Sequence, residues 1–192
     1  SLIIENKNQE PVFYDKAKLV PFGEYLPFIN LKSYLKISKR SNLFGWGFKR
    51  GKGSELLNLP NGLNFVPLIC YEAIFSNFLK PSVKNADFIL QITNDAWFGK
   101  SIGPQQHLAQ LRIRAIEYGV PVIRVANTGI SAIIDANGEV IKHLSVNKSD
   151  YLDSFIPSRK HSTIYGNFGN LIFLLLVFLG AVIAFINKKF IK

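Results

Sequence analysis

Short apolar runs separated by turn-forming residues organise the first 157 residues of the chain. One run extends from Asn64 to Cys70 and follows the turn-forming sequence Leu59-Pro60-Asn61-Gly62, and a second extends from Ala86 to Thr93. Apolar runs of this length between turn residues are typical of buried β-strands. Residues 121–125 form a similar run, so the pattern predicts a third buried strand there.

A helical period replaces this pattern between the second and third runs. Gly103-Pro104 places a proline in the first turn of the predicted helix, and Gly119 provides its C-terminal stop. Its predicted apolar stripe consists of Leu108, Leu111, Ala115 and Ile116, whereas Arg112, Arg114 and Glu117 are expected on other faces. Residues 131–144 predict a β-hairpin with Asn137-Gly138 in its turn. Strands that alternate with a helix and then pair as a hairpin predict an α/β fold with a mixed sheet.

The end of the chain has a different character. Residues 169–186 carry no charge, and Asn187-Lys188-Lys189 follows them. A run of this length predicts a transmembrane helix over 169–187, with a juxtamembrane linker at 158–168 and a basic tail at 188–192. The lysines just beyond the run favour a cytoplasmic C-terminus. The alternative for the same pattern is an apolar helix buried in a protein core.

Composition limits the classes of function. The chain has 192 residues, 48% hydrophobic and 19% charged, which indicates one globular domain with a core. The formal net charge is +10, but no nucleic-acid-binding motif accompanies it, so no nucleic-acid partner is expected. The excess of lysine indicates a solvated basic surface or attraction to phospholipid headgroups. The single cysteine excludes an internal disulfide, and no spacing of ligand residues indicates a metal or another cofactor.

Two further features concern the extent and irregularity of the chain. It begins with Ser1 and contains no methionine, so we expect it to be a piece of a longer protein or a processed chain. Residues 29–54 are polar, aromatic and glycine-containing, which predicts a long irregular segment. Segments of this kind often form functional lids.

Cys70 is the first candidate for chemistry. It stands at the end of a predicted strand, where α/β proteins commonly present catalytic groups, and the ionisable residues Tyr71 and Glu72 follow it. A thiolate is a strong nucleophile when a cation or a base lies nearby. The alternative is a buried cysteine that serves only as a small hydrophobic residue. The strand alone leaves both interpretations open.

The segment from Asp15 to Pro27 supplies a candidate cation and a candidate carboxylate. Two prolines and a glycine restrict its backbone, and Lys16 and Glu24 are held near its two ends. A lysine near a developing oxyanion stabilises it, while a glutamate can position that lysine or act as a base. An ordinary charged surface loop is the alternative.

Six motifs carry a resemblance to a known family. They are Lys16-Ala17-Lys18-Leu19-Val20-Pro21-Phe22-Gly23-Glu24-Tyr25, Ile69-Cys70-Tyr71-Glu72, Thr93-Asn94-Asp95-Ala96-Trp97-Phe98-Gly99, Gly103-Pro104-Gln105-Gln106-His107, Arg112-Ile113-Arg114-Ala115-Ile116-Glu117 and Arg124-Val125-Ala126-Asn127-Thr128-Gly129-Ile130-Ser131. Together they resemble the carbon–nitrogen hydrolase (nitrilase) superfamily, and within it the bacterial apolipoprotein N-acyltransferases. The resemblance covers nearly the whole chain. It implies a nitrilase-like α-β-β-α sandwich, present in part as residues 1–157, followed by one C-terminal transmembrane helix.

The resemblance also implies a catalytic triad of glutamate, lysine and cysteine. Cys70 matches the nucleophile, Lys16 matches the triad lysine, and Glu24 matches a second glutamate that supports the site. The general-base glutamate of the family lies upstream of the lysine. Glu5 and Glu10 do not match its context, so the chain is expected to lack this base.

Four other positions are implied to assist the reaction. The backbone N–H of Tyr71 would contribute to an oxyanion hole, and Glu72 would support it. Trp97 and Phe98 match an aromatic segment near the binding site of the acyl chain. No metal is implied.

The implied reaction is a ping-pong acyl transfer. A fatty acyl group would pass from a membrane glycerophospholipid to the Cys70 thiol, and then to the N-terminal diacylglyceryl-cysteine amine of an apolipoprotein. The implied location is the bacterial inner membrane, with the catalytic domain in the periplasm and the C-terminus in the cytoplasm. Two alternatives stay open: a nitrilase-type amidase or carbamoylase with the same triad, and an inactive membrane-tethered remnant. The sequence does not indicate an oligomeric state.

Overall fold

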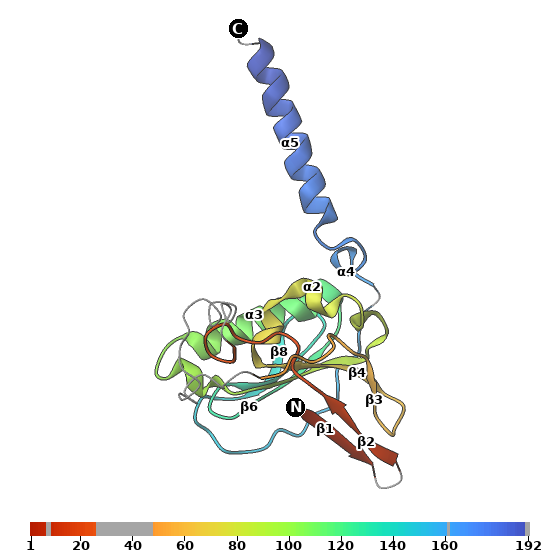
Figure 1. Ribbon diagram of the computed structural model, residues 1–192, viewed down its shortest axis with the longest axis vertical. Helices are drawn as coiled ribbons and strands as arrows, with labels where there is room; N and C mark the ends of the chain where they lie inside the picture. The colour runs from red at the N-terminus through yellow and green to blue at the C-terminus, as the bar shows by residue number, and fades with distance from the viewer. Residues whose placement is uncertain (7–8, 26–47, 161, 191–192) are drawn as a thin grey trace, which may run out of the picture.

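A six-stranded mixed β-sheet forms the centre of the protein in a computed structural model that describes residues 1–6, 9–25, 48–160 and 162–190 (Figure 1). Its strands, in spatial order, are β3 (Leu57–Asn58), β4 (Asn64–Ile69), β5 (Phe88–Thr93), β6 (Val122–Ala126), β7 (Ser131–Ile134) and β8 (Val140–Leu144). A separate antiparallel pair consists of β1 (Leu2–Asn6) and β2 (Gln9–Tyr14). The predicted α/β class is therefore confirmed.

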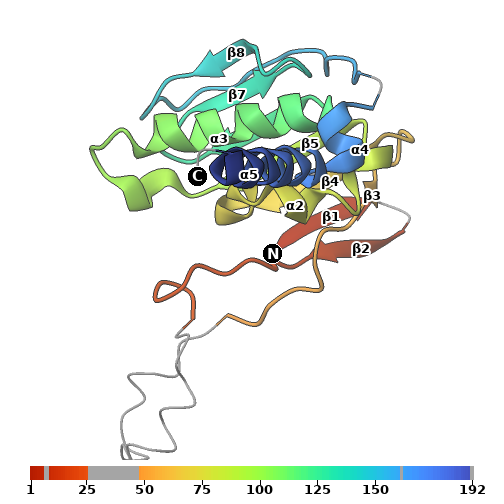
Figure 2. The same ribbon diagram turned by 90° about the horizontal axis from the view of Figure 1, so that it is seen from above.

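Helices make up the rest of the regular structure, and some of those between the strands cover one face of the sheet. They are the 3₁₀-helices η2 (Cys70–Ile74), η3 (Val83–Asn85) and η4 (Asp95–Phe98), and the α-helices α2 (Ser76–Leu79), α3 (Gly103–Tyr118), α4 (Ile164–Phe168) and α5 (Leu171–Phe190). Figure 1 shows α2 and α3 above the sheet, and Figure 2 shows the same layers from above.

β4, β5 and β6 pair in parallel, and this pairing determines where catalytic side chains can lie together. The carboxyl ends of parallel strands lie at the same edge of a sheet, which is where α/β folds place their sites. Cys70 directly follows β4 and Asp95 opens η4 shortly after β5, so both lie at this edge. The outer pairs β3–β4, β6–β7 and β7–β8 are antiparallel.

The side chains of β4 alternate between two hydrophobic clusters, as the period of a strand requires. Val66 and Leu68 are buried against the helix layer, in a cluster that includes Leu79 of α2 and Leu111 of α3. Phe65 points to the other face, where it stacks on Phe88 at a ring-centroid distance of 5.3 Å and joins Tyr14 and Leu57 in a second cluster.

The predicted helix at Gly103–Gly119 is confirmed, and its last residue explains its end. Gly119 adopts the left-handed conformation with φ 64° and caps α3 through its N–H, which donates to the carbonyl of Ala115. Two predictions about its faces were wrong. Ile116 is 52% exposed, whereas Arg114 is buried because it pairs with Glu117 three residues further along the helix.

The predicted hairpin at 131–144 and the turn before β4 are both confirmed. Gly62 and Gly138 occupy left-handed positions in these two turns, with φ 85° and 78°. Most of the irregular segment predicted at 29–54 lies outside the described residues. Its described end, residues 48–54, has no helix or strand.

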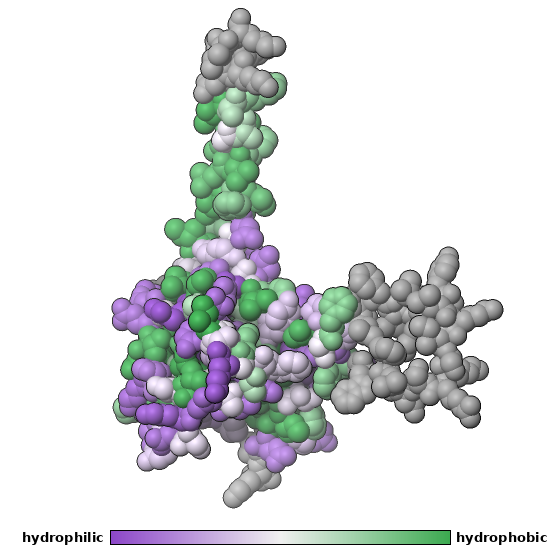
Figure 3. All heavy atoms as spheres, turned by 90° about the vertical axis from the view of Figure 1, so that its left-hand side faces the viewer, coloured by the Kyte–Doolittle hydropathy of each residue, from purple (hydrophilic) through white to green (hydrophobic). Residues whose placement is uncertain are grey.

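The C-terminal apolar run folds as α5, which projects from the domain with exposed apolar side chains along its length (Figure 3). Within the described part of the chain, no helix has the length and apolar character needed to cross a membrane. The predicted transmembrane helix at 169–187 is therefore not supported. Gly169 and Asn170 precede the helix, which begins at Leu171.

Candidate active site

Cys70 occupies a sharp turn between β4 and η2. Its φ is 51°, so it adopts the left-handed conformation that costs an L-residue roughly 1–2 kcal/mol. Strain of this kind persists only where the surrounding structure enforces it, and it is common at functional sites. The turn places a half-buried thiol at the carboxyl edge of the sheet, beside a cavity.

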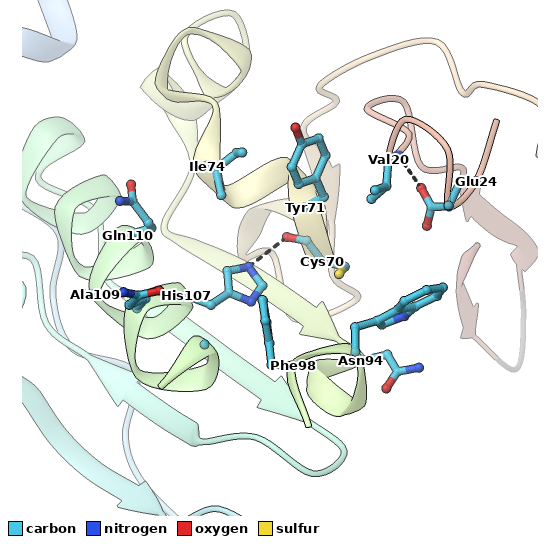
Figure 4. A pocket seen from close by; sticks show the side chains of 14 residues that line it. Val20, Glu24, Cys70, Tyr71, Ile74, Asn94, Phe98, His107, Ala109 and Gln110 are labelled. Atoms are coloured by element: carbon cyan, nitrogen blue, oxygen red, sulfur yellow. Dashed lines mark hydrogen bonds between the residues drawn. The ribbon is translucent and has the colours of Figure 1, made fainter. Parts of the chain in front are cut away.

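This cavity has a volume of about 810 Å³ and joins residues from four parts of the chain (Figure 4). Its lining includes Glu24, Cys70, Tyr71, Trp97, Phe98 and His107. Trp97 is 73% exposed and Phe98 is 39% exposed, so η4 presents aromatic surface beside the thiol. The structure thus brings five of the seven predicted site residues to one cavity, and Lys16 and Glu72 lie next to it.

Lys16 and Glu24 form one unit, which fits the positioning role that the sequence left open for Glu24 beside that of a base. The Lys16 ammonium donates to both carboxylate oxygens of Glu24, with Nζ–Oε distances of 2.6 and 2.7 Å. The backbone N–H of Val20 also donates to Glu24, at 2.8 Å. Both side chains are largely buried, at 10% and 17% exposed. Glu24 lines the cavity and therefore holds Lys16 in place beside it.

Glu72 connects this loop to the turn that carries Cys70. Its fully buried carboxylate accepts four hydrogen bonds. Oε1 accepts from the backbone N–H groups of Ala17 and Lys18, at 2.7 and 3.1 Å. Oε2 accepts from the hydroxyl of Tyr14 at 2.9 Å and from the N–H of Ile69 at 2.8 Å. The Glu72 side chain thus binds the backbone just before Cys70, at Ile69, and the backbone just after Lys16, at Ala17 and Lys18.

A second buried polar group lies behind Cys70. We call it the Asp95 network, and it consists of Gln91, Asp95, His107 and Arg124, which are all nearly inaccessible to solvent. Asp95 accepts from Arg124 at 2.5 Å, and its other oxygen lies 3.0 Å from Nδ1 of His107. Arg124 also donates to the amide oxygen of Gln91. The network ends at the backbone oxygen of Cys70, 3.1 Å from Nε2 of Gln91 and 3.2 Å from Nε2 of His107.

The electrostatics of this network keep Asp95 ionised. Burial raises the pKa of Asp95, but the hydrogen bond with His107 and the charge of Arg124 outweigh it and hold the pKa below its usual value. An ionised carboxylate accepts hydrogen bonds only, so Nδ1 of His107 carries the proton that it shares with Asp95. Burial also lowers the pKa of Arg124, although the neighbouring Asp95 opposes that shift.

The motifs of the sequence analysis contain Asp95, His107 and Arg124 without giving them a role, and Gln91 lies outside all of them. A usable signal was present, because Gln91 and Arg124 interrupt strands that are otherwise apolar. A polar side chain in a buried strand needs a hydrogen-bonding partner. Gln91 and Arg124 pair in register on the neighbouring parallel strands β5 and β6, so each supplies the other's partner.

The close packing of Gly129 against Asp95 yields a test of the network's rigidity. A Cβ at position 129 would lie 2.0 Å from Oδ2 of Asp95. We expect Gly129→Ala to lower the free energy of unfolding by about 1–3 kcal/mol, because Asp95 must move within a packed interior. Urea-induced unfolding followed by circular dichroism measures this. Gly180→Ala is the matched control, because nothing lies within 4 Å of that Cβ, and an equal loss in both variants would contradict the expectation.

Comparisons with known proteins agree with the motifs. The family profile described as Carbon-nitrogen hydrolase matches residues 1–159. An apolipoprotein N-acyltransferase from Rhizobium rhizogenes is 43% identical over 186 residues, which cover 97% of this chain and 35% of the relative. Another from Rickettsia bellii is 45% identical over 190 residues, covering 97% and 37%. The chain thus spans about a third of the length of these curated relatives.

A solved amidase structure from Nesterenkonia sp. is more distant. It is 20% identical, has a TM-score of 0.45, and covers 53% of this chain and 41% of the amidase chain. The predicted resemblance to apolipoprotein N-acyltransferases is confirmed by the sequence relatives. Because the profile matches 159 of the 192 residues, the chain belongs to the carbon–nitrogen hydrolase family.

Proposed function

We propose that this chain carries the nucleophile and the lysine of an N-acyltransferase that acylates apolipoproteins through a thioester at Cys70. The observation that carries the proposal is the cavity that contains Cys70 and Glu24, with Lys16 bonded to Glu24 and aromatic residues of η4 in its wall. A cavity of about 810 Å³ with apolar walls suits a long acyl chain. Relatives with 43–45% identity that are named for this activity support it.

The first half-reaction forms the thioester. The thiolate of Cys70 attacks the carbonyl carbon of an acyl ester, and a carbon–sulfur bond forms as the carbonyl oxygen becomes an oxyanion. The ammonium of Lys16 and the backbone N–H of Tyr71 stabilise that charge. The carbon–oxygen bond to the alcohol then breaks, and the leaving oxygen takes up the proton that a base removed from the Cys70 thiol.

The second half-reaction transfers the acyl group to nitrogen. The amine attacks the thioester carbon, a carbon–nitrogen bond forms, and the carbon–sulfur bond breaks to regenerate the thiolate. The amine loses a proton to a base in this step. Glu24 is already engaged with Lys16 and with the N–H of Val20, so it serves to hold Lys16.

We further propose that the acyl donor is a membrane glycerophospholipid and the acceptor is the N-terminal diacylglyceryl-cysteine of an apolipoprotein. Both substrates are lipids, so the enzyme would act at the inner membrane of a bacterium with its site on the periplasmic side. The exposed apolar surfaces of α5 and η4 are compatible with contact to lipid.

The decisive experiment detects the covalent intermediate. The full polypeptide that the gene encodes is incubated with phosphatidylethanolamine in detergent micelles, and its mass is measured before and after proteolysis. We expect a mass increase of one acyl group on the peptide that contains Cys70, and release of that group by hydroxylamine. Addition of a diacylglyceryl-cysteine peptide should discharge the thioester and yield an amide. Rapid release of ammonia from small amides, with no acyl group retained from phospholipid, would instead indicate the amidase alternative.

A further inference from the structure

The Cys70–Tyr71 peptide unit joins the catalytic turn to the Asp95 network. Its carbonyl oxygen belongs to Cys70 and its N–H belongs to Tyr71. A trans peptide is planar, so its C=O and N–H bonds point in opposite directions and cannot turn independently. Whatever holds the Cys70 oxygen therefore also fixes the direction of the Tyr71 N–H.

Gln91 holds that oxygen, and His107 holds Gln91. Nε2 of Gln91, on β5, donates to it at 3.1 Å, and Nε2 of His107, on α3, lies 3.2 Å from it. Figure 4 shows this second contact as a dashed line between the His107 ring and the backbone of Cys70. The two Nε2 atoms are themselves 3.1 Å apart. Because Nδ1 of His107 carries the ring proton, its Nε2 accepts the second hydrogen of the Gln91 amide.

The remaining members of the network lock these two side chains. The oxygen of the Gln91 amide accepts from Arg124, which orients its nitrogen toward Cys70. Asp95 holds Nδ1 of His107 at 3.0 Å, which leaves Nε2 as an acceptor for the Gln91 amide. Arg124 in turn donates to Asp95 and to the carbonyl of Ile130, so it is anchored at both ends.

We propose that Gln91 and His107, fixed by Arg124 and Asp95, are positioning residues that orient the Tyr71 N–H toward the oxyanion formed at Cys70. This inference rests on the proposed function, because it assigns a purpose to the network only if Cys70 is acylated. Burying four polar side chains costs free energy that an apolar core would not. The network contacts the one carbonyl beside the nucleophile, so a role in catalysis would explain why these polar side chains are buried here.

Substitutions at His107 can separate its two nitrogens. Asparagine places its amide nitrogen near the position of Nδ1, so His107→Asn can still bond Asp95 but does not reach the Gln91 amide. Glutamine places its terminal amide near the position of Nε2, so the amide oxygen of His107→Gln can still accept from Gln91. Thr93→Val is the matched control, because the Thr93 hydroxyl donates to Asp95 at 3.0 Å but does not contact Cys70.

Two reagents separate orientation of the oxyanion hole from access to the thiol. Acylation by p-nitrophenyl butyrate passes through an oxyanion and releases a burst of p-nitrophenolate. Methyl methanethiosulfonate also requires the thiolate, but its attack at sulfur forms no oxyanion at carbon. A variant that has merely lost structure reacts abnormally with both reagents, whereas a misdirected Tyr71 N–H impairs acylation alone.

In the full polypeptide, we expect His107→Asn to lower the burst rate about 10- to 100-fold while its methanethiosulfonate rate stays within about threefold. His107→Gln should acylate about tenfold faster than His107→Asn, and Thr93→Val should acylate like the unsubstituted protein. Equal burst rates in the unsubstituted protein and His107→Asn would overturn this inference alone. Parallel loss of both reactions would overturn it as well, because that marks a structural role. No burst in the unsubstituted protein would overturn the proposed function and this inference with it.

Discussion

Replacing Cys70 with alanine is expected to abolish the acyl-enzyme and to lower acyl transfer by a factor on the order of 10⁴ or more. No other cysteine is present to replace the lost thiol. Serine at this position is expected to be equally inactive, because a hydroxyl needs a much stronger base than a thiol to become a nucleophile. Mass spectrometry of the intact protein and transfer of a labelled acyl group to a diacylglyceryl-cysteine peptide measure both effects.

The backbone at Cys70 supplies a matched control for folding. Alanine and serine keep the cost of the left-handed conformation at φ 51°, whereas glycine adopts it freely. We therefore expect Cys70→Gly to be roughly 1 kcal/mol more stable than Cys70→Ala in urea unfolding, and equally inactive. Acyl transfer at the normal rate in any of these variants would disprove the assignment of Cys70 as nucleophile. Equal stability of the glycine and alanine variants would show that the turn is not strained.

The strands, the helix and the turns near the site were predictable because each depends on local sequence. The apolar run before Cys70 has the length of a buried strand, and Gly119 ends α3 by a conformation that glycine favours. The faces of α3 were less predictable. Arg114 was placed away from the apolar stripe because of its charge, yet its pairing with Glu117 allows it to be buried. The helical period brings residues at this spacing together, but it does not show that the pair is buried.

Parts of the site that depend on contacts between distant segments were not predictable from spacing. Lys16 and Glu24 lie within one constrained loop, so their pairing could be expected. The convergence of Gln91 and His107 on one carbonyl involves β5 and α3, and no local pattern relates them. The start of α5 was not predictable either: the uncharged run begins at Gly169, whereas the helix begins at Leu171.

The second large effect is expected at Glu72, where Glu72→Gln should lower the free energy of unfolding by about 3 kcal/mol. Each carboxylate oxygen receives two donors, and three of the four are backbone N–H groups, which cannot become acceptors. Burial and then the charge of Glu72 raise the pKa of Tyr14 well above its usual value, so its hydroxyl keeps the proton that it donates to Glu72. In either orientation, the glutamine NH₂ group would face at least one backbone N–H group.

Glu72 joins the Lys16 loop to the turn at Cys70, so Glu72→Gln should also slow acylation of Cys70 about 100-fold. A displacement of roughly 1 Å between reacting groups can cause an effect of this size. Urea unfolding measures the stability, and hydrogen exchange at the amides of Ala17, Lys18 and Ile69 measures the local effect. Glu139→Gln is the control: this exposed glutamate has the same chemistry, and its replacement should change stability by less than about 0.5 kcal/mol. Faster exchange at all three amides of Glu72→Gln would show that one buried carboxylate holds the lysine and the nucleophile in register. Unchanged exchange, with stability equal to that of the control, would show that the two segments keep their arrangement without it.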